Sequence, residues 1–301
     1  MSTYEPLISV IIPSSNHGKY IKECLKSVLS QTYSSLEVIV VDNFSTDTTD
    51  DELNSIHDPR LRILKINNGG VIGISRNKGI ENARGDWLAF LDSDDYWEPN
   101  KLAECITHLS HTDFTYHDMK ISVQTNDQSQ FIRSRGLIYP ILLDLLMNGN
   151  TIVTSSVLVK KSIVLSVGGF DEGLEMVGFE DYNLWLKVAL VTNSFQHITK
   201  ILGHYRKHDL NTSRNVRYVV PWVAINNFLF VLSPKQRKEL AVKLRYVKFK
   251  SEILDGRHIN VRDDLLAILT SQNFGLICKA LTVYFFYRYL KFGRRLMRSW
   301  K

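Results

Sequence analysis

Residues 87–95 have the sequence WLAFLDSDD, in which an apolar run is followed by three carboxylates within four positions. The run from Trp87 to Leu91 predicts a buried β-strand that delivers Asp92 at its carboxyl end. Open α/β sheets bind their ligands at that edge. Crowded carboxylates repel one another unless a cation compensates their charge, so the cluster indicates a hard divalent ion held by oxygen ligands. An acidic turn that caps the following helix is the alternative at this point.

The residues before this stretch repeat a strand and helix pattern. Leu7–Ile12 and Leu36–Val41 are apolar runs, interrupted only by Ser9 and Glu37, as expected for parallel strands buried on both faces. Apolar side chains between them recur at helical spacing, namely Ile21, Cys24, Leu25, Val28 and Leu29. We expect a further strand over Arg62–Asn67 and a helix over Ser75–Arg84, which Gly85 ends as a C-terminal cap. The first hundred residues therefore predict an α/β fold.

The pattern changes to helices near Ser213. Before that point we expect a helix over Asn100–Leu109, a strand over Ser156–Val159 and a helix over Asp181–Val191, while residues 112–150 are too weakly patterned to assign. Beyond it the sequence predicts helices over Val219–Leu232, Pro234–Leu254 and Leu276–Trp300.

Charge divides the chain at almost the same place. The net charge is +6, but it is unevenly distributed. Residues 1–215 have 20 basic and 26 acidic side chains, whereas residues 216–301 have 17 basic and 5 acidic side chains. No acidic residue follows Asp264, so the end of the protein should be drawn to an anionic surface such as a membrane or nucleic acid. No recognised nucleic-acid module accompanies this charge, so we expect no nucleic-acid partner.

Composition and targeting signals indicate a cytoplasmic globular protein. The three cysteines, Cys24, Cys105 and Cys278, are spaced far apart and are expected to be reduced thiols. The start of the chain has no secretory signal pattern. The best candidate for a membrane span, Leu276–Leu290, is interrupted by Lys279 and Arg288, so a transmembrane anchor is not expected.

Two further clusters contain side chains that can take part in catalysis or ligand binding. Glu180 and Asp181 are adjacent carboxylates at a predicted helix start, where one of them can act as a rigidly held general base or simply as a helix cap. Residues 204–208, HYRKH, combine imidazole, guanidinium and ammonium groups. Such a cluster can be solvated, or it can complete a metal shell and neutralise phosphate.

Together these segments resemble the family 2 inverting glycosyltransferases of the bacterial surface-polysaccharide type, over roughly residues 6–215. The resemblance is carried by motifs in a fixed order: ISVIIPSSN at 8–16, SVLSQTY at 27–33, VVDNFSTD at 40–47, GISRNKG at 73–79, DSDD at 92–95, GGFD at 168–171 with FEDYNLW at 179–185, and YRKH at 205–208. Asp92–Asp95 is similar to the family's DxD motif.

The resemblance implies the GT-A fold, a Rossmann-like, mixed and mainly parallel sheet flanked by helices. The catalytic domain would span residues 1–215, and residues 216–301 would form a helical, basic extension. The enzyme would move a sugar from a nucleotide-sugar, a UDP-hexose or UDP-N-acetylhexosamine, to a hydroxyl of a lipid-linked or surface-glycan acceptor, as in O-antigen, lipopolysaccharide, capsule or exopolysaccharide synthesis.

The resemblance also implies roles for single residues. Pro13, Ser15, Asn16, Asp42 and Asn43 would line the nucleotide pocket, Arg76 would lie near the base or diphosphate, and Asp92 and Ser93 would face the ribose or sugar. Asp94 and His208 would bind Mn²⁺ or Mg²⁺. Asp181 would be the catalytic base, with Glu180 as the next candidate. Many members carry two aspartates at positions 42 and 43; Asn43 can bond a pyrimidine edge but lacks the charge, which leaves nucleotide preference open.

Three hypotheses remain at this stage. Besides a glycosyltransferase, the acidic cluster fits a metal-dependent nucleotidyl- or phosphotransferase, or a non-catalytic nucleotide-sugar sensor. The Glu180–Asp181 pair favours the first, since a sensor needs no base. The last helix would gather aromatic side chains on one side and basic ones on the other, which predicts peripheral binding to the cytoplasmic face of the inner membrane, with packing on the catalytic domain as the alternative.

Overall fold

The computed structural model describes residues 5–123, 130–208, 222–254, 261–271 and 273–285. The chain separates into two compact units, residues 1–211 and 212–301, which are described one at a time. The boundary expected at residue 215 lies outside the described residues, so that position stays a prediction.

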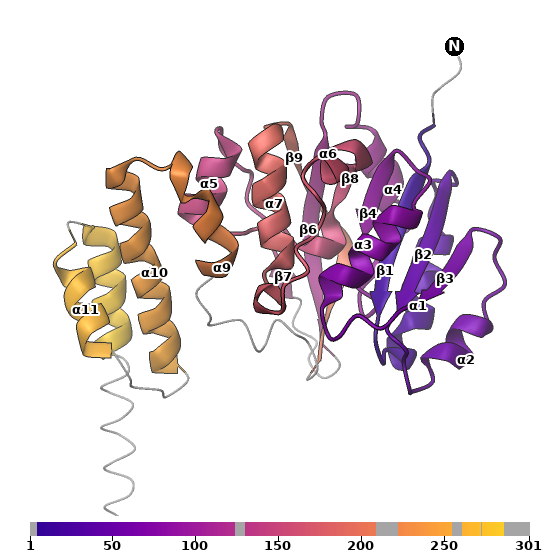
Figure 1. Ribbon diagram of the computed structural model, residues 1–301, viewed down its shortest axis with the longest axis horizontal. Helices are drawn as coiled ribbons and strands as arrows, with labels where there is room; N and C mark the ends of the chain where they lie inside the picture. The colour runs from indigo at the N-terminus through magenta and orange to yellow at the C-terminus, as the bar shows by residue number, and fades with distance from the viewer. Residues whose placement is uncertain (1–4, 124–129, 209–221, 255–260, 272, 286–301) are drawn as a thin grey trace, which may run out of the picture. The chain divides into compact units, whose positions relative to one another are not determined.

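The first unit is built on a nine-stranded sheet among the described residues, in the order β3-β2-β1-β4-β8-β6-β9-β5, with β7 paired to β6 (Figure 1). The first four neighbours are parallel: β3 (Leu61–Lys65), β2 (Leu36–Asp42), β1 (Ile8–Ser14) and β4 (Trp87–Phe90). The others are β8 (Leu158–Lys160), β6 (Phe114–Val123), β9 (Phe195–Lys207), β5 (Tyr96–Trp97) and β7 (Gln130–Ile132). β8 is antiparallel to both its neighbours, and β9 runs parallel to β6.

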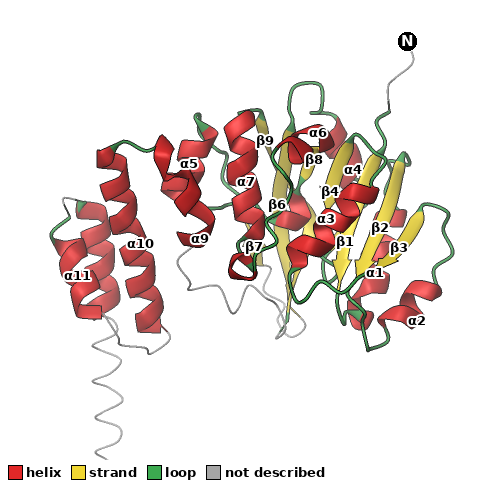
Figure 2. Ribbon diagram, viewed as in Figure 1, coloured by secondary structure: helices red, strands yellow, loops and turns green. Residues whose placement is uncertain are grey.

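Helices cover both faces of this sheet (Figure 2). The helices of the first unit are α1 (Gly18–Leu29), α2 (Thr49–Asn54), α3 (Ile72–Asn82), α4 (Lys101–Ile106), α5 (Ile141–Asn148), α6 (Lys161–Ser166) and α7 (Glu180–Val191), with 3-10 turns η1 (Thr154–Ser156) and η2 (Leu174–Met176). The apolar stripe of α1 joins Val10 and Ile12 in one core cluster. Because side chains alternate along a strand, the neighbouring Ile11 faces the opposite side, where it meets α3 at Gly79.

The expected α/β arrangement of the first hundred residues is confirmed, but the role assigned to Gly85 is wrong. Helix α3 ends at Asn82, and the following Ala83 is already extended. A Cβ on Gly85 would lie 2.4 Å from the carbonyl oxygen of Leu7, and the Gly85 amide donates a hydrogen bond to Ser9 Oγ at 2.9 Å. Glycine is required there because the turn runs against β1.

The weakly patterned middle of the chain contains β6, β7 and α5. The strand expected over Ser156–Val159 begins instead at Leu158, because residues 154–156 form η1. In that turn the amides of Ser156 and Val157 donate hydrogen bonds to the carbonyls of Val153 and Thr154. These local bonds take the place of ladder bonds and leave the Thr154 and Ser155 side chains for other contacts.

The second unit is helical in its described residues, with α9 (Trp222–Ile225), η3 (Asn226–Val231), α10 (Pro234–Leu254), α11 (Val261–Leu269) and a helix over 274–285. Helix α10 has the expected bounds. In the described part of the helix expected over 219–232, from residue 222 on, the chain forms a short α-helix followed by a 3-10 turn. Phe249, Ile253, Ile268 and Ala280 form a core of their own. Of the helix expected over Leu276–Trp300, residues 286–300 lie outside the described residues. No described helix combines the length and apolar character needed to cross a bilayer.

Candidate active site

The parallel strands β1, β2 and β4 end at one edge of the sheet, and their following loops carry most of the residues that the sequence singles out. Ser14 at the end of β1 pairs with Asp42 at the end of β2, and Ile11 pairs with Phe90 of β4. The loops after these strands must therefore lie beside one another.

Asn16 and Asp42 tie the first two loops together. The fully buried Asp42 accepts hydrogen bonds from the hydroxyl of Ser45 at 2.5 Å and from its amide at 3.0 Å. Asn16, which has a left-handed backbone with φ 54°, donates its amide to Ser45 Oγ at 2.8 Å. Its side-chain oxygen accepts from the amide of Thr46 at 2.8 Å. The structure thus brings together two of the expected nucleotide-binding residues.

The neighbouring residues differ in exposure. Pro13 is buried within β1, and Ser15 is exposed. The side-chain oxygen of Asn43 accepts a hydrogen bond from the amide of Asn68 at 2.9 Å. Asn43 therefore holds the loop that leads into α3 in this structure.

Within the acidic cluster after β4, Asp95 is the most enclosed carboxylate. It accepts hydrogen bonds from Ser155 Oγ at 2.6 Å and from the amide of Arg206 at 2.9 Å. Ser155 Oγ also accepts from the amide of Asp92 at 3.1 Å. Burial and the negative charges of Asp94 and Asp92 raise the pKa of Asp95 well above its usual range. Asp95 therefore joins β4, η1 and β9 rather than facing a ligand.

Asp94 lies among imidazoles. Its Oδ2 is 2.8 Å from Nε2 of His208, which follows β9. One ligand atom from each of His17, Asp94 and His208 lies within 4.8 Å of the other two. One carboxylate and two imidazoles at this spacing fit a divalent cation. Asp94 and His208 were predicted as ligands, whereas His17 was missed. The other histidine of the 204–208 cluster, His204, contacts Glu98 Oε1 at 2.6 Å instead.

Arg76 is buried between the two acidic clusters. One terminal nitrogen lies 2.7 Å from Asp92 Oδ1 and the other 2.7 Å from Glu180 Oε1, and only 3% of the side chain is exposed. Its guanidinium also lies 5.2 Å from the ring centre of Phe170. Burial alone would lower the pKa of Arg76, but the carboxylates of Asp92 and Glu180 raise it. Both terminal nitrogens are thus engaged by carboxylates in this structure, and the predicted place of Arg76 near the base or diphosphate stays a prediction.

Asp181 is the second residue of α7, next to Glu180, but it has different hydrogen-bond partners. Its Oδ1 accepts from the amide of Tyr182 at 2.6 Å, and its Oδ2 accepts from Thr154 Oγ1 at 3.1 Å. Burial and the negative charge of Glu180 raise the pKa of Asp181 to about 7, against the opposing effect of Arg76. A carboxyl group with this pKa exchanges protons readily near neutral pH.

Besides Arg76, the turn η1 also connects the two acidic clusters. Thr154 contacts Asp181, while the adjacent Ser155 contacts both Asp92 and Asp95. Sequence reasoning missed both residues, because isolated hydroxyl residues in a poorly patterned segment carry no recognisable signal. Ser93, predicted to face the sugar, is 1% exposed and lies 2.7 Å from Nδ1 of His17 through its hydroxyl.

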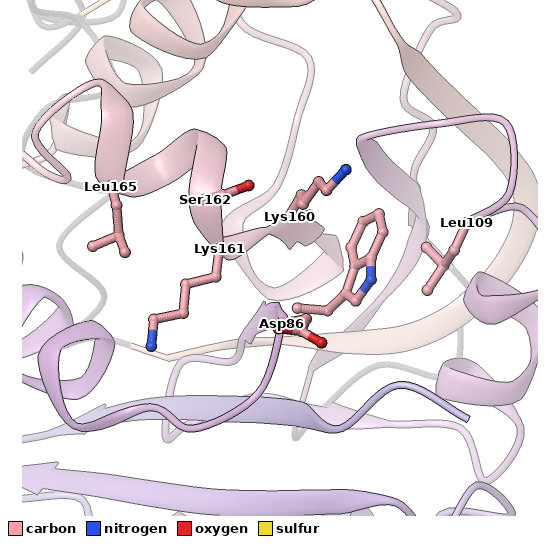
Figure 3. Close-up of a pocket in the computed structure, with 7 residues that line it drawn as sticks. Asp86, Leu109, Lys160, Lys161, Ser162 and Leu165 are labelled. Atoms are coloured by element: carbon pink, nitrogen blue, oxygen red, sulfur yellow. The ribbon is translucent and has the colours of Figure 1, made fainter. Parts of the chain in front are cut away.

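A cavity of about 510 Å³ lies at the other end of β4, away from this site (Figure 3). It is lined by residues at the start of β4, at the end of β8 and in α6, including Asp86, Lys160 and Lys161. Lys161 Nζ donates to the carbonyl oxygen of Ala83, and the two lysine side chains point in different directions (Figure 3). The acidic clusters, rather than this cavity, carry the groups suited to catalysis.

Comparisons with known proteins agree with this geometry. The family model for glycosyl transferase family 2 matches residues 9–159. An uncharacterized glycosyltransferase of Rickettsia typhi is 33% identical over 226 residues, which cover 70% of this chain and 67% of the relative. The UDP-Glc:alpha-D-GlcNAc-diphosphoundecaprenol beta-1,3-glucosyltransferase WfaP of Escherichia coli is 30% identical over 212 residues, covering 69% and 80%.

Among solved structures, the mannosyltransferase PcManGT from Pyrobaculum calidifontis, in complex with GDP-Man and Mn²⁺, has a TM-score of 0.60 and 18% identity. It is matched over 96% of this chain and 84% of its own. The fold is the expected GT-A fold of nucleotide-sugar transferases. The chain belongs to the family 2 glycosyltransferases and is an enzyme that transfers sugar.

Proposed function

We propose that the enzyme transfers a hexose or N-acetylhexosamine from a UDP-sugar to a hydroxyl of a lipid-linked or surface-glycan acceptor, with inversion at the anomeric carbon. The observation that carries this proposal is the pairing of two carboxylate sites. A cation-binding group at Asp94 and a carboxyl of raised pKa at Asp181 are joined through Arg76, Glu180 and η1. Such a pair suits a reaction that needs a diphosphate site and a base.

On the acceptor side, Asp181 takes the proton from the attacking hydroxyl. Its pKa of about 7 lets it accept a proton at neutral pH and hold it until product leaves. Thr154 and the amide of Tyr182 fix the two carboxylate oxygens. Glu180 Oε1 is paired with Arg76 at 2.7 Å, so Glu180 serves as a positioning residue in this proposal.

On the donor side, Asn16, Asp42, Asn43 and the loops they hold receive the nucleotide, with Pro13 and Ser15 beside them. Asp92, held by Arg76 with about a third of its side chain exposed, faces the sugar or ribose. Asp94 and His208 would hold Mn²⁺ or Mg²⁺, which supplies Lewis-acid stabilisation of the departing diphosphate.

The comparisons support this choice of substrates. One S. aureus TarS structure is a complex with UDP-GlcNAc, and it has a TM-score of 0.57 and 19% identity to this chain. WfaP is named for a UDP-glucose donor and a diphosphoundecaprenol acceptor. A lipid-linked acceptor would place the enzyme at the cytoplasmic face of the inner membrane.

The test incubates full-length protein and Mn²⁺ with UDP-glucose, UDP-GlcNAc or GDP-mannose, with and without a polyprenyl-diphosphate-linked GlcNAc. We expect release of UDP that the acceptor accelerates, and a product of inverted anomeric configuration by NMR. Release of sugar 1-phosphate with transfer of the nucleotidyl group, or release of UMP with transfer of the sugar phosphate, would instead identify a nucleotidyl- or phosphotransferase. Tight donor binding without release of UDP would identify a sensor.

Membrane association through the C-terminal region is a separate part of the proposal. Its support is the sequence, in which residues 286–301 carry six basic side chains and no acidic one. We expect full-length protein to float with anionic liposomes, partly released by 1 M salt, and a form lacking residues 285–301 to stay behind. Failure of the full-length protein to float would remove this part and leave the catalytic assignment intact.

A further inference from the structure

His17 joins the cation site from a loop that the sequence motifs assign to the nucleotide. We propose that His17 is a third protein ligand of the divalent cation and that it makes the site select Mn²⁺ over Mg²⁺. The inference rests on the proposed function only in placing the cation at Asp94 and His208. The supporting observation is that one ligand atom of each of the three residues lies within 4.8 Å of the other two.

Contacts within the protein hold the His17 ring in place. Its Nδ1 lies 2.7 Å from the hydroxyl oxygen of the buried Ser93, which leaves Nε2 for the cation. Its backbone amide donates to Thr49 Oγ1 at 3.1 Å. A hydrogen bond from the far nitrogen of a metal-binding imidazole fixes the ring's orientation and tautomer. Ser93 is placed to do this for His17.

The same aromatic side chain orders both imidazoles. Tyr20 of α1 stacks on His208 with ring centres 4.9 Å apart, and meets the edge of His17 at 6.0 Å. The two imidazoles lie edge to face at 6.0 Å. Tyr20 is itself a buried residue of α1. Its packing therefore helps to position both imidazoles of the site.

The donor set decides which cation binds. Mg²⁺ prefers oxygen ligands and keeps much of its water, whereas imidazole nitrogen favours first-row transition ions. With Asp94 and His208 alone, one nitrogen and one oxygen would discriminate weakly. A second imidazole from His17 makes the set two nitrogens and one carboxylate, which favours Mn²⁺.

The test measures binding to full-length protein without donor. Mn²⁺ affinity is followed by the loss of the free-ion EPR signal, and Mg²⁺ affinity by competition against Mn²⁺. We expect His17→Ala to lose about 10–100-fold in Mn²⁺ affinity and much less for Mg²⁺. His17→Asp should move the preference toward Mg²⁺, because it replaces nitrogen with oxygen. His57→Ala, at an exposed histidine in the loop after α2, is the matched control and should change neither affinity.

Pulsed EPR of the parent protein gives a second readout that needs no variant. Electron spin echo modulation from ¹⁴N should indicate two imidazoles on bound Mn²⁺, and one after His17→Ala. Modulation from a single imidazole in the parent, or an unchanged ratio of Mn²⁺ to Mg²⁺ affinity in both His17 variants, would overturn the inference. Circular dichroism melting of each variant checks that the fold is retained.

The outcomes separate this inference from the proposed function. Transfer of sugar by the parent, with unchanged cation binding in His17→Ala, would refute the ligand and keep the function. Loss of Mn²⁺ affinity in His17→Ala, in a parent that releases no UDP from any donor, would keep the ligand and refute the function.

Discussion

The acidic cluster after β4 and the acidic pair at the start of α7 share one feature: carboxylates that are close in sequence have different partners. The first cluster lies in a loop, and the second begins a helix. In the first cluster Asp95 is enclosed by Ser155 and the Arg206 amide, while Asp94 lies among imidazoles. In the second, Glu180 is bound by Arg76 while Asp181 meets Thr154. Adjacent carboxylates thus differ in role, because packing brings different partners to each.

The largest expected effect is the loss of turnover that distinguishes a variant of Asp181 from one of Glu180. Asp181→Asn should leave donor affinity unchanged and lower kcat by about 10²–10⁴-fold, because the amide fills the same space but cannot accept the proton. Glu180→Gln should mainly lower stability, since it weakens the bond to Arg76. Steady-state kinetics and thermal melting of both variants check this. Near-parental turnover in Asp181→Asn, with turnover lost in a stable Glu180→Gln, would exchange their roles.

Arg76 connects the two clusters, so its loss should affect both. Arg76→Met should lower the free energy of unfolding by about 3–5 kcal/mol, because Glu180 is left as a buried, unpaired carboxylate. Lys78→Met is a matched control on the same helix, since the Lys78 bond to Glu81 is exposed, and should cost less than about 0.5 kcal/mol. Urea denaturation measures both. Equal effects would show that the Arg76 bridge contributes little.

Within the first cluster, Asp94 and Asp95 should respond differently. Asp94→Ala should remove metal-dependent UDP binding, a loss of at least about 100-fold in Mn²⁺ affinity. Asp95→Asn keeps an acceptor oxygen for the Arg206 amide, and its side-chain NH2 group can donate to Ser155 Oγ, so it should largely keep that binding. Calorimetric titration of UDP with and without Mn²⁺ compares them. Metal-independent UDP binding by the parent would contradict the assignment of Asp94.

The smallest expected effect concerns Thr154. The rate should rise with pH through about 7, since Asp181 acts when deprotonated. Thr154 stabilises the charged carboxylate by donating a hydrogen bond, so Thr154→Val should raise the pKa of Asp181 and move the midpoint of the kcat profile upward by roughly 0.4–1 pH unit. The exposed Thr107→Val serves as control. A midpoint that stays or falls would show that Thr154 does not act on the base.

Local sequence was sufficient to predict an element where the segment itself has a strong apolar pattern. Leu36–Val41 and the helical stripe from Ile21 to Val28 predicted β2 and α1, because strands buried on both faces and amphipathic helices have strong periodicities. The position of Asp92 at a strand end followed from the same pattern. Strand β9 carries no such signal, since most of its side chains are partly or fully exposed and give no continuous apolar run.

The sequence by itself determined the α/β order, the family motifs and the candidate carboxylates, because these depend on residues close together in the chain. Only the tertiary structure decided that Arg76 binds Asp92 and Glu180, that Thr154 and Ser155 reach the two clusters, and that His17 meets Asp94 and His208. These contacts join loops from distant strands. Their geometry depends on strand order and helix packing, and no single segment contains that information.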